Sequence, residues 1–176
     1  MNLPNKLTVL RVIMVPFFVL FMLTDLGGDA NKWIALAIFC VASLTDMLDG
    51  KIARARNLVT NFGKFMDPIA DKVLVLSAMS MFVSWGRMPA WILVVVIARE
   101  LAVSALRMIA VDNGRVIAAG WSGKVKTAST MVCICIMLLL CIQPLDWVCN
   151  GVILVTTAYS GIEYFVKNRD VLNWNK

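Results

Sequence analysis

Four aspartates that lie inside or beside strongly apolar stretches are the side chains in this sequence best suited to chemistry. They are Asp46, Asp49, Asp67 and Asp71. An ionised carboxylate at membrane depth costs about 2.5 kcal/mol or more, so four of them need a common partner. Residues three or four apart share one face of a helix. The spacing therefore predicts two pairs of carboxylates, each presented to one side of its own helix.

The connection between the two pairs predicts where they meet. A short polar segment, about 55–63, is long enough to reverse the chain, so we expect two antiparallel helices with their carboxylates converging. Four like charges in one place repel one another unless a cation neutralises them. The chain contains no histidine, and oxygen-only ligands select Mg²⁺ or Mn²⁺ over Zn²⁺. Two such ions are a common device for phosphoryl transfer. Gly50, Ala53 and Gly63 are small positions where a ligand or another helix could approach the backbone.

Composition predicts an all-α, polytopic membrane protein. The chain has 176 residues, of which 60% are hydrophobic, and one membrane-spanning helix needs about 20 apolar residues. Six spans with short loops therefore occupy the whole chain as a single domain, residues 1–176. The expected spans are about 7–23, 33–52, 65–85, 89–111, 128–142 and 147–166.

The charge pattern favours lipid headgroups and phosphorylated substrates as partners. The formal net charge is +6, but the lysines and arginines are scattered between apolar stretches and form no basic face for nucleic acid. Most of them fall on the side of the membrane that carries the four aspartates. The positive-inside rule makes that side cytoplasmic and places both termini there.

The first and fourth expected spans carry further polar residues. Asn5, Thr8 and Arg11 fall on roughly one face of the first span, where anchoring to lipid headgroups is one explanation. Arg99 and Glu100 lie near the middle of the fourth span, where an unpaired charge is most costly, so we expect them to pair.

A basic cluster follows the fourth span. Arg107 lies eight residues beyond Arg99, and the segment 112–127, which we expect to be a loop, carries Lys124 and Lys126. Basic side chains next to a carboxylate–metal site are suited to hold a phosphorylated acceptor.

The aspartates belong to a longer pattern. Asp46-x2-Asp49-Gly50-x2-Ala53-Arg54-x8-Gly63-x3-Asp67-x3-Asp71 resembles, position for position, the signature of the CDP-alcohol phosphatidyltransferases. Members of this family are integral membrane enzymes that move a phosphatidyl group from CDP-diacylglycerol, or a phospho-base from a CDP-alcohol, onto a hydroxyl. The resemblance implies that the four aspartates hold two Mg²⁺ or Mn²⁺ ions, with Asp71 also the general base. It assigns binding of the CDP group to Gly50, Ala53, Arg54 and Gly63.

One branch of that family is similar over nearly the whole chain. It shares the start Pro-Asn-x-Leu-Thr-x-x-Arg, Ala98-Arg99-Glu100-Leu101 and Gly123-Lys124-Val125-Lys126-Thr127. Its acceptor is sn-glycerol 3-phosphate. By matching position, Thr8 and Arg11 would line the donor site, as the alternative to headgroup anchoring. Arg107, Lys124 and Lys126 would bind the acceptor's phosphate. The resemblance also implies a homodimer in a bacterial inner membrane.

The expected reaction is a direct displacement on CDP-diacylglycerol that releases CMP, because no activated nucleophile is evident near the motif. Inositol phosphate, serine or phosphatidylglycerol remain alternative acceptors, although the basic cluster favours a phosphorylated one. A divalent-cation transporter is a remote alternative. It would place its acids near the bilayer midplane, whereas these lie near one membrane face.

Overall fold

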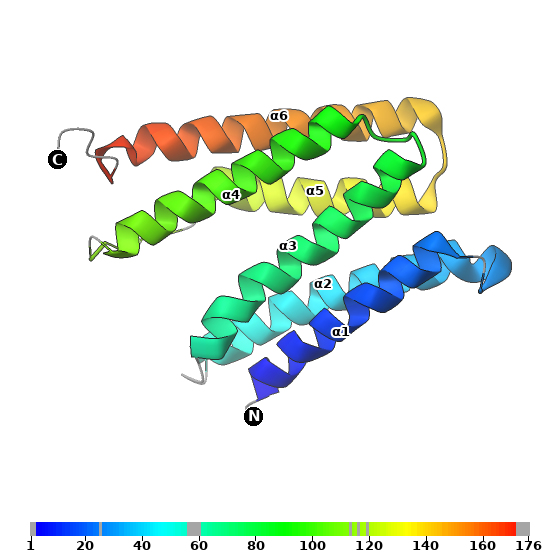
Figure 1. The fold of residues 1–176 in the computed structure, drawn as a ribbon, viewed down its shortest axis with the longest axis horizontal. Coiled ribbons are helices and arrows are strands. Elements are labelled where there is room, and N and C mark those ends of the chain that lie inside the picture. Colours follow the sequence, from blue (N-terminus) through cyan, green and yellow to red (C-terminus); the bar gives the residue numbers. More distant parts are fainter. Residues whose placement is uncertain are drawn as a thin grey trace. The chain divides into compact units, whose positions relative to one another are not determined.

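The computed structural model is all-α and has six long helices in the part of the chain that it describes (Figure 1). They are α1 (Leu3–Leu23), α2 (Asn31–Ala55), α3 (Asn61–Ser84), α4 (Ala90–Asp112), α5 (Trp121–Leu139) and α6 (Gln143–Lys167). Two 3-10 helices, η1 (Gly28–Ala30) and η2 (Arg169–Val171), complete the elements. The structure describes the backbone of residues 3–24, 26–55, 61–112, 114–115, 117–118 and 120–171. Side chains are described for the same residues except 3–5, 29, 46–55, 61–65 and 67–68.

The helices form two compact units. The first comprises Met1–Trp85 with Leu138–Cys141, and the second comprises Gly86–Met137 with Ile142–Lys176. In the first unit α1 packs along both α2 and α3. Phe18 of α1 and Phe39 of α2 are fully buried, with ring centroids 5.9 Å apart. This aromatic pair fixes α1 against the helix that carries the first two aspartates.

Helices α2 and α3 run in opposite directions within this unit (Figure 1). This confirms the predicted chain reversal, because α2 ends at Ala55 and α3 begins at Asn61. Residues 56–60, the centre of the predicted connection, lie outside the described residues.

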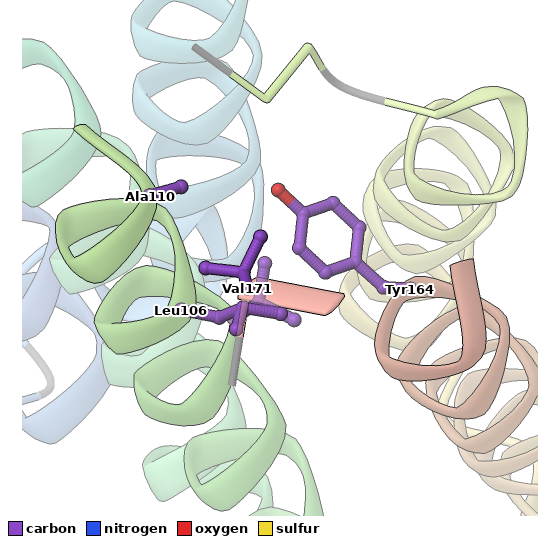
Figure 2. Close-up of a cluster of buried hydrophobic side chains, with 5 residues drawn as sticks. Leu106, Ala110, Tyr164 and Val171 are labelled. Carbon is purple, nitrogen blue, oxygen red and sulfur yellow. The ribbon is translucent and has the colours of Figure 1, made fainter. Parts of the chain in front are cut away.

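In the second unit α4 and α6 lie side by side and run in the same direction, so that residues near 103–110 meet residues near 164. Their contact is a cluster of buried side chains that includes η2 (Figure 2). Its members are Val103, Leu106, Ala110, Tyr164 and Val171. The backbone of α5 does not approach α4 or α6 as closely among the described residues. Instead, polar side chains join it to both helices.

Gly114 ends α4 with a Schellman motif. Its φ is +71°, in the left-handed region that glycine adopts without strain. Its N–H donates to the Val111 carbonyl at 2.9 Å, and the N–H of Arg115 donates to the Ala110 carbonyl at 2.8 Å. Carbonyl groups that would otherwise be unsatisfied at the end of the helix thus find donors.

Two predicted boundaries around α5 are wrong. The helix begins at Trp121, so the second part of the segment predicted as a loop, 112–127, is helical. Gly123 in its first turn costs about 1 kcal/mol of helix propensity, but Lys126 gains a carboxylate partner that favours this helical arrangement. The helix ends at Leu139 rather than near residue 142, and Pro144 lies in the first turn of α6. Proline is favoured there because the first N–H groups of a helix have no intrahelical acceptor.

Two helices in the described part of the chain are long and apolar enough to cross a membrane. The windows are Lys6–Leu23 in α1 and Trp121–Leu139 in α5. Together with the apolar composition they are consistent with a membrane protein.

Candidate active site

The four predicted aspartates lie on α2 and α3 of the first unit. Asp46 and Asp49 fall in the second half of α2, and Asp67 and Asp71 in the second and third turns of α3. The backbone is helical through both stretches, so each pair shares one face of its helix, as the spacing predicts. The side chains of Asp46, Asp49 and Asp67 lie outside the described set, and convergence of the four carboxylates stays a prediction.

Asp71 is the member of this set whose side chain the structure describes. It is half-buried, next to Ala70, which is fully buried in the first unit. A half-buried carboxylate can bind a cation or take a proton while it remains in reach of a ligand. Among the described side chains no group of three or more acids, cysteines or histidines could hold a metal, and three of the four predicted ligands lie outside that set. The donor set itself, carboxylates without histidine, fits Mg²⁺ or Mn²⁺.

Arg11 and Thr8 are buried on α1, three residues apart on one face. Arg11 is 0% exposed and Thr8 is 1% exposed. The Nε of Arg11 donates a hydrogen bond to the carbonyl oxygen of Ala42 at 3.2 Å. Ala42 lies one helical turn before Asp46 on α2. This burial argues against headgroup anchoring for both residues and places the Arg11 side chain near the turn that carries the first aspartate.

The other predicted donor-binding residues are located by their backbone alone. Gly50, Ala53 and Arg54 follow Asp49 in the last turns of α2, and Gly63 lies in the first turn of α3. They therefore occupy the helix ends on either side of the chain reversal. Their side chains lie outside the described set, so their role in binding the CDP group stays a prediction.

Arg107 has an aromatic partner that sequence reasoning missed. Its Nε donates a hydrogen bond to the Tyr164 hydroxyl at 2.9 Å, and its guanidinium carbon lies 5.4 Å from the centre of the same ring. Tyr164 is only 6% exposed and belongs to the cluster in Figure 2, whereas Arg107 as a whole is exposed. A rigid ring thus holds one side of the guanidinium. The two residues are 57 positions apart, and no local pattern in the sequence connects them.

Lys124 and Lys126, both predicted to bind the acceptor, have different surroundings on α5. Lys124 is exposed, whereas Lys126 is 5% exposed and its Nζ lies 2.7 Å from Oε1 of Glu100 on α4. The same oxygen accepts a hydrogen bond from Arg99 at 2.8 Å, which confirms the expected pairing of Arg99 with Glu100. The ammonium group of Lys126 is therefore already paired with a carboxylate, while that of Lys124 reaches the surface of the unit. Binding of a phosphate by either lysine stays a prediction.

Comparison with known proteins decides the family. The family model described as CDP-alcohol phosphatidyltransferase matches residues 1–161. The chain belongs to this family. The match includes both aspartate pairs, Arg107 and both lysines.

Several curated proteins are similar to this chain over most of their length. The CDP-diacylglycerol–glycerol-3-phosphate 3-phosphatidyltransferase of Bacillus subtilis (strain 168) is 40% identical, with 97% of each chain covered. The enzyme of the same name from Escherichia coli (strain K12) is 40% identical over 93% of this chain and 85% of its own. A probable phosphatidylglycerophosphate synthase of Mycobacterium tuberculosis (strain ATCC 25618 / H37Rv) is 39% identical over 94% of this chain and 81% of its own.

Proposed function

We propose that this protein transfers the phosphatidyl group of CDP-diacylglycerol to sn-glycerol 3-phosphate, which yields phosphatidylglycerophosphate and CMP. The choice of acceptor rests on the similarity to relatives from three bacteria that are named for this reaction. Each alignment covers at least 93% of this chain. The placement of both aspartate pairs on antiparallel helices of one unit supports the family chemistry.

The metal centre of this proposal consists of Asp46, Asp49, Asp67 and Asp71. Two Mg²⁺ or Mn²⁺ ions bound there would neutralise charge on the pyrophosphate of the donor and on the departing CMP. Gly50, Ala53, Arg54 and Gly63 at the ends of α2 and α3 would bind the CDP group. Thr8 and Arg11 would line the donor site from α1, where both are buried.

In this proposal, side chains of the protein bind the acceptor and accept its proton. Arg107 and Lys124, both exposed on the second unit, would hold the phosphate of glycerol 3-phosphate, with Lys126 behind them. Asp71 would take the proton of the acceptor's C1 hydroxyl. The hydroxyl oxygen then forms a bond to the β-phosphorus while the bond from that phosphorus to CMP breaks. Because a carboxylate is a weak base near neutral pH, positioning of the acceptor must supply much of the rate.

The proposed setting is a bacterial inner membrane. Six spans with both termini in the cytoplasm would place the helix ends that carry the aspartates at the cytoplasmic face, where the soluble acceptor meets the lipid donor. We include a homodimer in the proposal on the strength of the family resemblance.

A transfer assay tests the proposal directly. Purified protein in detergent with CDP-diacylglycerol, Mg²⁺ and radiolabelled glycerol 3-phosphate should yield a labelled, phosphorylated lipid, and EDTA should abolish it. Unlabelled inositol phosphate and serine, added as competitors, should leave the yield unchanged. Label entering lipid only from another acceptor would overturn the assignment of the acceptor. No lipid product from any acceptor would overturn the proposed enzyme activity.

A further inference from the structure

Glu100 of α4 holds two cations from two helices on one carboxylate oxygen. Arg99 lies 2.8 Å from Oε1 and Lys126 of α5 lies 2.7 Å from the same atom. Arg99 also reaches α6, where its NH2 group donates to the Ser160 hydroxyl at 2.6 Å. All four side chains lie within the second unit, and Lys126 and Ser160 are buried. The carboxylate therefore joins α4 to α5, and its partner Arg99 joins α4 to α6.

We propose that Glu100 is a positioning residue for the acceptor: by fixing Lys126, it sets the rotation of α5 and so places Lys124 for the acceptor's phosphate. This inference rests on the proposed function, because it takes Lys124 and Arg107 as the groups that bind that phosphate. Glu100 itself need not contact the substrate.

The geometry of α5 gives this ion pair control over Lys124. Residues advance by about 100° around a helix, so Lys124 lies about 200° from Lys126, on nearly the opposite side. The structure shows this difference directly, since Lys126 is buried and Lys124 is exposed. Holding Lys126 inward on Glu100 therefore turns Lys124 outward.

Other side chains of α5 reach α6, since Ser122 shares a hydrogen bond with Glu163 and Cys133 shares one with Cys149. The backbones of α4 and α6 approach each other closely, whereas in the described residues α5 is joined to them through side chains. The contact between Ser129 and Thr156, with hydroxyl oxygens 3.3 Å apart, joins α5 to α6 about one turn further along. Among the described side chains, the Lys126–Glu100 pair is the ion pair that joins α5 to α4, and it lies two residues from Lys124, so its loss should disturb Lys124.

Gly161 and Gly123 leave room for the Arg99 side chain in this arrangement. A Cβ added to Gly161 would lie 3.2 Å from Cγ of Arg99, and one added to Gly123 would lie 3.8 Å from its NH2 group. Arg99 thus passes close over α6 and ends beside the first turn of α5. Arg99, which shares the Glu100 carboxylate with Lys126, is therefore itself held between α5 and α6.

The charges predict how variants should differ. Arg99, Lys126 and Glu100 together carry one excess positive charge. Glu100→Gln leaves two cations without a carboxylate in a region poorly accessible to water, whereas Lys126→Met leaves a neutral Arg99–Glu100 pair. We therefore expect Glu100→Gln to lower thermal stability clearly and Lys126→Met to lower it little. The double variant Glu100→Gln/Lys126→Met restores the original net charge without restoring the link, so its stability should lie nearer the wild-type value.

The test is the KM for each substrate in these variants. If Glu100 positions Lys124, the KM for glycerol 3-phosphate rises about tenfold in Glu100→Gln and stays raised in the double variant, as loss of a charged hydrogen bond implies. The KM for CDP-diacylglycerol changes less than about twofold, since the proposed donor residues belong to the first unit. Glu100→Asp, which keeps the charge and shortens the reach, should give an intermediate KM.

Asp146→Asn is the matched control. Asp146 is buried at the start of α6 in the same unit and accepts two hydrogen bonds from the half-buried Arg87, at 2.7 and 2.8 Å. This variant should lose thermal stability and keep the wild-type KM for glycerol 3-phosphate. A raised KM here would show that any damage to the unit produces the effect, and would overturn the inference.

Two outcomes separate this inference from the proposed function. If Lys126 binds the phosphate directly, Glu100→Gln frees the lysine and lowers the KM for glycerol 3-phosphate. A lowered or unchanged KM in this variant overturns the positioning role of Glu100. Arg107→Met and Lys124→Met test the acceptor site itself. If both leave the KM unchanged, the proposed acceptor site fails. If Arg107→Met and Lys124→Met raise the KM for glycerol 3-phosphate while the Glu100 variants do not, only the inference about Glu100 fails.

Discussion

The Nε of Arg11 on α1 donates a hydrogen bond to the carbonyl oxygen of Ala42, one helical turn before Asp46 on α2. Arg11 is fully buried, and a guanidinium removed from water is retained only where it has partners. This contact joins the first helix of the chain to the helix that carries the first aspartate pair. It connects the N-terminal pattern, which sequence reasoning left with two explanations, to the proposed donor site.

Arg11→Met should weaken binding of the donor. We expect the KM for CDP-diacylglycerol to rise about tenfold, because hydrogen bonds to a charged group contribute about 1.5–3 kcal/mol, while the KM for glycerol 3-phosphate is unchanged. Lys6→Met, an exposed cation on the same helix, is the control and should behave as wild type. Equal KM values for CDP-diacylglycerol in the two variants would contradict a role for Arg11 in donor binding.

Tyr164→Phe should weaken binding of the acceptor. The variant keeps the ring next to Arg107 and removes the hydroxyl that accepts the Nε hydrogen bond. Because Arg107 is exposed to solvent, loss of this hydrogen bond should cost about 1 kcal/mol of binding free energy. We therefore expect a rise of about fivefold in the KM for glycerol 3-phosphate. Tyr159→Phe, which alters an exposed tyrosine of the same helix, should leave the KM for glycerol 3-phosphate unchanged. Identical kinetics in both variants would show that the Tyr164 hydroxyl does not support Arg107.

Asp71→Asn should abolish most of the transfer. An amide cannot take the acceptor's proton and is a poorer metal ligand, so turnover should fall by a factor of about 10² to 10⁴. Asp112→Asn, at the exposed end of α4, is the control for the loss of one carboxylate. Yield in the membrane fraction should match wild type for both. Near-normal turnover of Asp71→Asn would exclude Asp71 as the base.

The contact between Arg115 and Asp170 should make stability depend on pH in acid. The Arg115 hydrogen bond lowers the pKa of the Asp170 carboxyl from its ordinary value, so the folded state favours the ionised form. Its stabilisation is complete above the unfolded-state pKa, about 4, and is lost as the pH falls through the lower folded-state pKa. Both side chains are more than half exposed, so the effect should be small and weakened by salt.

A comparison of melting temperatures for wild type and Asp170→Asn measures this effect. Wild type should melt higher near neutral pH, and the difference should vanish in strong acid. A difference that stays constant down to low pH would mean that the ion pair does not cause it.

The sequence was sufficient to predict the all-α fold, the positions of the aspartates and the pairing of Arg99 with Glu100. Apolar composition decides the first, and helix spacing decides the second, because it fixes which residues share a face whatever the tertiary packing. The pairing of Arg99 with Glu100 was predictable because a charge in an apolar segment needs a partner and the nearest one is the next residue.

Relationships between helices could not be predicted in the same way. Lys126 meets Glu100 across 26 positions, and Arg107 meets Tyr164 across 57. Neither pair leaves a periodic signal, since each depends on how two separate helices pack. The start of α5 was missed for the same reason: its first turns look like a polar loop until the partner of Lys126 on α4 is known.

The charged link between α5 and α4 also affects how the protein is made. A lysine costs about 2.5–3.5 kcal/mol at the centre of a span that enters the bilayer alone and less toward its end, and Lys126 lies in the second turn of α5. In the proposed six-span topology, α4 is synthesised first and already carries the carboxylate that lowers this cost for Lys126. During co-translational insertion, Lys126 would gain this partner if α4 is still beside the insertion site when α5 emerges. The same ion pair that fixes a helix in the finished enzyme would then act as an assembly signal on the ribosome-bound chain.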